Sequence, residues 1–221
     1  APACAVSGRL DLDFRVGSGA DRSAPMDFLV KGALTGGEIQ DGRLPYRLYD
    51  VRAHLELDNH HLRLEHVFAR NGISTVTLQL ERRGWQDNGP LTLTAETRRL
   101  ELDSRFLEVL PRDLQALWRK YFPAGTIDAR LRLDFDGRRW TPELAVACQD
   151  VSFAYHRFPY RLERGRGTVQ LKDNRLQVDL TAAAGGQDVT IRSDVRAPGE
   201  HFTGWVEFSC QQPIPLDEKL L

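Results

Sequence analysis

The sequence predicts a mainly β protein, built from tandem antiparallel meander repeats that form an elongated curled sheet (a β-trough), with one amphipathic helix between the repeats. Three observations predict this fold class. The chain repeats itself with a period of about 115 residues. Most segments alternate apolar and polar residues with a period of two, which is typical of half-buried antiparallel strands. Short clusters of Asp, Asn and Gly separate these segments, as they do in hairpins.

The composition is that of a globular protein. Of the 221 residues, 41% are hydrophobic and 28% are charged, which argues against wholesale disorder. The net charge is −1, so the basic excess of a nucleic-acid-binding protein is missing. No apolar run is long enough to cross a bilayer, and the first residues do not resemble a signal peptide. We therefore expect the sequence to be an excised piece of a longer chain.

The repeat is clearest at two segments that both begin with Pro-Tyr-Arg-Leu. Pro45 aligns with Pro159, an offset of 114 (159 − 45), and at this offset Gly72 falls on Gly186. Upstream blocks align at an offset of 117, with Gly8 on Gly125. The alignment predicts repeat 1 at residues 7–123, with strands within 8–103, and repeat 2 at 124–221. Repeat 2 stops where its helix should begin, so we expect the array to continue beyond this chain.

Within each repeat, the alternating segments place aliphatic side chains on one face. These residues are the candidates for an apolar groove: Leu55, Leu57, Leu62, Leu64, Val76, Leu78, Leu80, Leu91, Leu93, Val169, Leu171, Leu176, Val178, Val189 and Ile191. An earlier segment alternates in the same way through Leu10, Leu12, Phe14 and Val16.

The connections carry turn chemistry. We expect turns at five places in the sequence: Asp58-Asn59, Asp173-Asn174, Gly36-Gly37, Gly185-Gly186 and Asp87-Asn88-Gly89. The Gly36-Gly37 turn is also expected to absorb the three residues by which the two offsets differ.

One stretch breaks the period of two. From about residue 105 to 121, apolar residues recur at steps of three and four, which predicts a helix with one apolar stripe. Pro111 is expected in the first turn of the main part of this helix, and Pro123 with Gly125 should end the helix.

The apolar face needs a cover. Each repeat presents about a dozen inward apolar side chains, and leaving them wet would cost on the order of 20 to 30 kcal/mol. A meander avoids this cost by curling into a trough or sandwich that the helix partly covers. A trough that closes is a core, whereas one that stays partly open is an elongated apolar channel suited to acyl chains.

Several short patterns, in this order and spacing, resemble the AsmA-like and TamB-like envelope proteins of the repeating β-groove lipid-transfer group. The pattern elements are Gly8–Asp11 and Gly125–Asp128, Trp140–Leu144, the two Pro-Tyr-Arg-Leu segments, and the passage Leu100–Pro111 into the helix. The resemblance covers essentially the whole chain as a loose pattern of strands and turns. Two features depart from it: the high density of Arg and Glu on the strands, and the long helix between repeats.

The resemblance implies a non-enzymatic protein on the periplasmic side of the cell envelope, anchored to the inner membrane by a segment outside this sequence. Its partner would be phospholipid or another acyl lipid, which it would bind or conduct between membranes or in support of outer-membrane assembly. It implies no cofactor, no metal and no catalytic residue to carry over.

Other candidate sites each have a plainer interpretation. His54, His60, His61 and His66 lie close in sequence, but repeat 2 has no histidine at the aligned positions, so we expect solvated or turn histidines. The Asp-x-Asp pair Asp134 and Asp136 lacks the remaining ligands of a calcium loop, so alternate acidic residues on a wet strand face explain it.

A basic stretch and three cysteines leave alternatives open. Arg157, Arg161, Arg164 and Arg166 either meet lipid headgroups or form a solvated face. Cys4, Cys148 and Cys210 have no metal-site spacing. The cysteines on strands are expected to be buried or half-buried thiols, and a Cys148–Cys210 disulfide is the alternative.

No nucleophile elbow, Walker loop or dinucleotide motif is present. The leading hypothesis is therefore a lipid-binding β-groove without catalytic activity. The alternative is a structural or adhesive β-repeat array with closed cores that binds protein or glycan partners. A hydrolase on a β-sandwich is a third hypothesis, and it would require a pocket with paired carboxylates.

Overall fold

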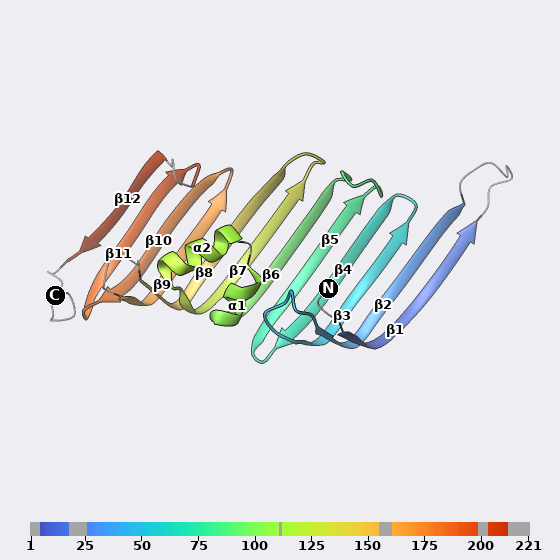
Figure 1. The fold of residues 1–221 in the computed structure, drawn as a ribbon, viewed down its shortest axis with the longest axis horizontal. Coiled ribbons are helices and arrows are strands. Elements are labelled where there is room, and N and C mark those ends of the chain that lie inside the picture. The colour runs from blue at the N-terminus through green and yellow to red at the C-terminus, as the bar shows by residue number, and fades with distance from the viewer. Residues whose placement is uncertain (1–4, 18–25, 111, 155–160, 199–202, 212–221) are drawn as a thin grey trace. The chain divides into compact units, whose positions relative to one another are not determined.

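The computed structural model describes residues 5–17, 26–110, 112–154, 161–198 and 203–211 (Figure 1). The fold is mainly β, as predicted, with twelve strands and two short helices in these residues. The elements are β1 (Ala5–Gly17), β2 (Asp27–Gln40), β3 (Leu48–Asp58), β4 (His61–Asn71), β5 (Ser74–Arg83), β6 (Leu91–Leu102), α1 (Ser104–Val109), α2 (Arg112–Tyr121), β7 (Ala124–Phe135), β8 (Trp140–Ala154), β9 (Arg161–Lys172), β10 (Arg175–Ala184), β11 (Gln187–Arg196) and β12 (Thr203–Cys210).

The strands follow one another in the sheet in the order of the sequence, from β1 to β12, and β1 and β12 do not pair with each other. The pairings β1 to β5 and β8 to β12 are all antiparallel. This order is an antiparallel meander, which confirms the predicted fold class. Each strand is long, between 8 and 15 residues, so a row of facing side chains can run across several neighbours.

The chain divides into two compact units, each described separately below. Unit 1 contains residues 1–97 and 131–142, and unit 2 contains residues 98–130 and 143–221. These units differ from the sequence repeats, because the last part of β7 and the start of β8 belong to unit 1.

Four of the five expected turns join consecutive strands. Asp173 and Asn174 have φ values of 50° and 57°, and Gly185 and Gly186 have 56° and 82°. Positive φ at both central residues is the type I′ geometry, which matches the right-handed twist of the flanking strands. Asp58, the last residue of β3, and Asn59 lead from β3 into β4, and Asp87-Asn88-Gly89 lies between β5 and β6.

The expectation for Gly36-Gly37 is wrong, because both glycines lie inside β2 rather than in a turn. Gly36 has a φ of 59° and is one extra residue relative to both β1 and β3. It therefore forms a β-bulge, which needs the same left-handed backbone as a turn. The connection from β2 to β3 lies further on, where the buried carboxylate of Asp41 accepts the Arg43 backbone N–H at 2.8 Å.

A second bulge shifts the repeat alignment by one residue. β4 has one more residue than β10, and His66, with a φ of 51°, lies where β4 slips against β3 and β5. Beyond this bulge the offset is 113, since β5 (Ser74–Arg83) corresponds to β11 (Gln187–Arg196). Gly72 therefore corresponds to Gly185, not to Gly186.

The predicted helix is split into two. The Asp103 carboxylate caps α1 by accepting the backbone N–H groups of Arg105 and Phe106. Leu110, with ψ at 149°, ends α1 in an extended conformation, as a residue before proline tends to do. Pro111 itself lies outside the described residues. α2 follows with Arg119 and Lys120 in its last turn, where cations offset the helix dipole. No described helix has the length and apolar character required to cross a membrane.

Candidate functional site

In unit 1, one face of the sheet carries apolar rows that run across five strands. The pairings place Leu12, Gly32, Leu55, Leu64 and Leu80 in one row from β1 to β5. A neighbouring row contains Phe14, Val30, Leu57, Leu62 and finally Arg82. Beyond the β4 bulge, Val67 faces Leu78 and Ala69 faces Val76. The apolar side chains thus stay on one face along the whole length of these strands.

Unit 2 has the same arrangement across β8 to β12. Its rows are Leu144, Leu171, Leu176, Val195 and Gly204; then Val146, Val169, Val178, Ser193 and Val206; then Cys148, Gly167, Leu180, Ile191 and Phe208. Ser193 is the one hydroxyl in these three rows, and it is buried. The rows form a continuous surface from β8 to β12.

All fifteen predicted groove residues lie on strands, as expected. Thirteen of them are half-buried, whereas Val189 and Ile191 are buried. Those in β3 to β5 and in β9 to β11 lie in the rows just described, apart from Val189, which faces Ala182 and Cys210. Leu91 and Leu93 lie in β6 and are also half-buried. A half-buried apolar surface remains partly accessible to a ligand, and that is the property a groove requires.

Sequence reasoning did not include the edge strands in the groove. On β1, Leu10, Leu12, Phe14 and Val16 are 49–64% exposed, and they continue the rows of unit 1. On β12, Val206 and Phe208 continue the rows of unit 2 and are also exposed. The period-two alternation in both segments is the signal that could have identified them.

One corner of unit 2 is closed. Leu162, Leu180, Ala182, Ala184, Val189 and Ile191 are each at most 9% exposed and form a contiguous cluster. The half-buried Phe153, Val169 and Val178 pack against this cluster. Along β10 the apolar face therefore changes from half-buried at Leu176 to buried at Leu180. This corner is a core rather than an open groove.

The opposite face is polar and carries ladders of alternating charge. In unit 1 the register places Asp13, Lys31, Glu56, Arg63 and Glu81 in one row across β1 to β5. Lys31 reaches Glu56 at 3.0 Å, and Arg63 reaches it at 3.9 Å. Exposed pairs of this kind contribute about 0–1 kcal/mol each, so they mark the wet face more than they stabilise it.

In unit 2 the ladder on this face is shorter. Asp179 faces Arg192, which faces Glu207, and the Asp179 carboxylate lies 3.7 Å from the Arg192 guanidinium. Beside it, Arg175 forms an ion pair with Asp194, and this hydrogen-bonded guanidinium lowers the pKa of the Asp194 carboxyl.

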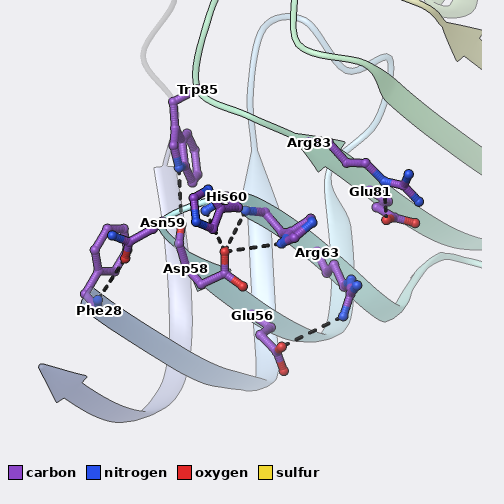
Figure 2. A network of polar contacts seen from close by, with 10 residues as sticks. Phe28, Glu56, Asp58, Asn59, His60, Arg63, Glu81, Arg83 and Trp85 are labelled. Atoms are coloured by element: carbon purple, nitrogen blue, oxygen red, sulfur yellow. Dashed lines mark hydrogen bonds and ion pairs between the residues drawn. The ribbon is translucent and has the colours of Figure 1, made fainter. Parts of the chain in front are cut away.

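Of the four clustered histidines, His60 and His61 take part in the hydrogen-bond network of the β3–β4 turn (Figure 2), whereas His54 and His66 lie on β3 and β4 with their ring centroids 5.4 Å apart. The Asp58 carboxylate accepts the backbone N–H of His60 at 2.6 Å and that of His61 at 2.7 Å. These bonds, that of His60 first, lower the pKa of Asp58. The Trp85 indole donates to the Asp58 carbonyl oxygen at 3.2 Å, which ties the β5–β6 connection to this turn. The described residues contain no group of three His, Cys, Asp or Glu side chains placed to hold a metal.

The Asp-x-Asp pair is also local structure. Asp136 caps the β7–β8 turn by accepting the backbone N–H groups of Arg138 and Arg139 at 2.7 and 2.9 Å. Asp134 accepts from Arg132 and Thr92, and these hydrogen bonds, that of Arg132 first, lower its pKa. Asp134 therefore hydrogen-bonds to side chains on the strands, and Asp136 stabilises the turn.

Two hollows have several charged residues in their lining, and the first is also lined by Leu12 and Leu55 of the apolar row. One of about 410 Å³ is lined by four carboxylates, Asp11, Asp13, Glu56 and Glu65, with Lys31 and His54. Arg9, Arg15 and Lys31 form ion pairs with the first three of them. The other, of about 890 Å³, lies among the turns around His60, Trp85 and Arg138.

The remaining candidates fall on the strands. Arg161, Arg164 and Arg166 are exposed on β9, and Arg161 donates to the Ser152 hydroxyl, while Arg157 lies outside the described residues. Cys148 is half-buried, and burial raises the pKa of its thiol. Cys210 is exposed, contrary to expectation, because it lies on the edge strand β12.

A Cys148–Cys210 disulfide does not fit this sheet. Strands β9, β10 and β11 separate β8 from β12, a distance of about 19 Å, and a disulfide requires Cα atoms within about 7 Å.

Comparison of the chain with protein-family models, curated protein sequences and solved structures returned no match.

Proposed function

We propose that this chain is a non-enzymatic segment of an AsmA-like cell-envelope protein that binds or conducts lipid acyl chains along its apolar sheet face. One observation supports the proposal above the others. In each unit, mostly apolar side chains line up across five neighbouring strands, and many of them on the inner strands are half-buried while those on the edge strands β1 and β12 are exposed; the other face carries charge ladders.

The dimensions suit a long alkyl chain. Five strands spaced about 4.8 Å apart span about 19 Å along a row, which is comparable to an extended fatty acyl chain. Each buried methylene contributes about 0.8 kcal/mol, so ten of them contribute about 8 kcal/mol. Association costs about 4–15 kcal/mol, so only long chains bind with useful affinity. The proposal therefore predicts selectivity for long acyl chains.

The more accessible residues of unit 2 are the better lipid contacts. Val169, Leu171, Leu176 and Val178 are half-buried, whereas the corner around Ala182 and Ile191 is already filled by protein. If the rest of the apolar face were buried as this corner is, the alternative function, a structural or adhesive array with closed cores, would be favoured.

Native mass spectrometry of gently purified protein distinguishes these two functions. Under the proposal, the spectrum shows adducts with the mass of phospholipid or fatty acid, and a fluorescent long-chain acyl probe binds and is displaced by them. If the purified protein carries no lipid and does not bind the probe, the result contradicts the proposed groove function and favours closed cores.

Matched variants locate the binding face. Leu78→Glu and Val178→Glu place a charge on the apolar face, whereas Gln79→Glu and Gln177→Glu place the same charge one residue away on the polar face. We expect at least a tenfold loss of probe affinity for the first pair and less than a twofold change for the second. Equal effects within each pair would contradict binding to the apolar face.

The proposal also assigns a compartment. The chain would lie on the periplasmic side of the envelope, held at the inner membrane by a segment outside this sequence. Fractionation of cells that make the full-length protein tests this assignment: recovery in the cytoplasm contradicts it, and recovery with envelope membranes supports it.

A further inference from the structure

We propose that the guanidinium group of Arg82 binds the carboxylate of a long-chain fatty acid whose alkyl chain lies along an apolar row of unit 1. This inference rests on the proposed acyl-chain function and specifies the class of ligand. The row in question crosses β1 to β4 through Phe14, Val30, Leu57 and Leu62 and reaches Arg82 on β5. An alkyl chain that follows this row therefore leads to a cation.

The neighbours of Arg82 on the same face are apolar. Leu62 faces it from β4. On the other side, the backbone N–H of Arg83 donates to the Pro90 carbonyl oxygen at 2.9 Å, so these two residues face each other and Leu91 of β6 faces Arg82. Leu62 and Leu91 are both half-buried. Arg82 is thus a charged residue within an apolar surface.

The charge and the donors of Arg82 are poorly satisfied by the protein. Its side chain is half-buried, and its Nε is inaccessible to water yet makes no hydrogen bond. Its Nη2 donates to the Gln86 carbonyl oxygen at 2.7 Å, and its Nη1 is left for a ligand at the surface. Arg82 forms no ion pair with any residue that the structure describes. Because a partly buried charge without a counter-ion is unfavourable, this position favours an anionic ligand.

Arginines on the polar face of the same sheet are in a different situation. Arg83, the next residue of β5, places its Nε 3.1 Å from the Glu81 carboxylate (Figure 2). Arg63 on β4 lies 3.9 Å from Glu56. The polar face therefore supplies counter-ions to its own cations, whereas Arg82 lies on the face that has none to offer.

The repeat shows that the fold does not require an arginine at this position. The offset of 113 between β5 and β11 places Arg82 on Val195. The pairing agrees, because Leu62 faces Arg82 and its counterpart Leu176 faces Val195. Val195 is 6% exposed, so an apolar side chain packs well there. The arginine is peculiar to unit 1, and a binding role accounts for it.

The surroundings of Arg82 favour a carboxylate over a larger anionic group. A guanidinium donates strong hydrogen bonds to carboxylate and phosphate oxygens alike. The phosphate of a phospholipid carries further polar groups, and some of them would lose water beside Leu62 and Leu91 without gaining a partner. A carboxylate ends the alkyl chain itself and adds no other polar atom. The single charge of Arg82 therefore matches a fatty acid best.

Displacement of Nile red, a neutral fluorescent probe of apolar surfaces, tests the assignment in the full chain. The competitors are hexadecanoic acid and its methyl ester, which share one alkyl chain and differ in charge at about pH 8. We expect the wild type to bind the acid about tenfold more tightly than the ester, because the acid alone gains the charged hydrogen bond.

Three variants locate this preference. Arg82→Val introduces the residue of repeat 2, so it should fold, bind the ester as the wild type does and lose the preference for the acid. Arg82→Gln also removes the charge but keeps a polar side chain, and it should give the same loss. Arg83→Val is the matched control on the polar face and should retain the preference. Far-UV circular dichroism checks the fold of each variant.

The outcomes separate this inference from the function on which it rests. If the wild type binds the acid and the ester equally, the role of Arg82 is wrong while acyl-chain binding stands. If it binds neither, the acyl-chain function fails as well. Equal losses in Arg82→Val and Arg83→Val would indicate an effect of net charge without a site. If dipalmitoylphosphatidylglycerol competes more strongly than the acid and depends on Arg82, the ligand is a lipid phosphate and the fatty-acid assignment is overturned.

Discussion

Two leucines on the same strand and the same face should respond very differently to truncation. Leu180 is 6% exposed and packs in the cluster of unit 2, whereas Leu176 is half-buried four residues earlier on β10. Leu180→Ala removes a buried side chain and leaves a cavity, so we expect a loss of about 3–5 kcal/mol in the free energy of unfolding. Leu176→Ala leaves less of a cavity, and we expect about 1–2 kcal/mol.

Urea unfolding of the whole chain, followed by tryptophan fluorescence and far-UV circular dichroism, measures both losses, provided that the two signals give one transition. The same variants separate core from groove in a binding assay. Leu176→Ala should weaken the binding of a long-chain acyl probe, because the Leu176 side chain lies on the accessible part of the apolar face. If the two variants lose the same free energy of unfolding, within about 0.5 kcal/mol, the inference that the apolar face changes from accessible to buried along β10 is wrong.

Three further predictions address the turns and bulges. The lowered pKa of Asp58 stabilises the folded protein at pH values above the usual carboxyl pKa of 3.8, and this stabilisation is lost as the pH falls through the lower pKa of the folded state. Asn at this position does not titrate, so Asp58→Asn should lose less stability than the wild type below about pH 4. A circular dichroism titration with acid measures the difference. Gly125→Ala should lower the free energy of unfolding in urea by about 3 kcal/mol or more, because its Cβ would lie 2.0 Å from a backbone oxygen. Gly72→Ala, with open space around it, should lower it by about 1 kcal/mol. Equal losses would contradict the close approach at Gly125. Deletion of His66 should change stability by at most about 1 kcal/mol, because it removes the bulge that repeat 2 lacks in β10, whereas deletion of Leu64 should prevent folding as judged by circular dichroism.

The sequence predicts the strands and most turns because local chemistry determines them. Asp173-Asn174 and Gly185-Gly186 adopt positive φ with little strain, and the flanking alternation leaves room only for a tight turn. Gly36-Gly37 carries the same local signal, yet it forms a bulge inside β2. Pairing with both neighbouring strands decides between the two outcomes, and no short segment contains that information.

The extent of the site is harder to predict than its face. Leu176 and Leu180 have the same residue type and the same place in the alternation, yet only Leu180 belongs to the buried cluster, which it forms with residues of β9, β10 and β11. The exposure of β1 and β12 follows from the strand order in the same way. Alternation specifies which side of a strand is apolar, while depth and access depend on tertiary packing.

The bulges explain how one face stays apolar through repeats of unequal length. An added residue in a strand would move every later side chain to the opposite face. In β4 the extra residue is taken up at His66, so that Val67 and Ala69 remain on the apolar face beyond it. Asp50 on β3 and Arg164 on β9, 114 residues apart, both have positive φ at register slips, so this bulge is common to both repeats. Each irregularity in the strands thus preserves the phase of the apolar rows, and a closed core and an open groove both depend on that phase.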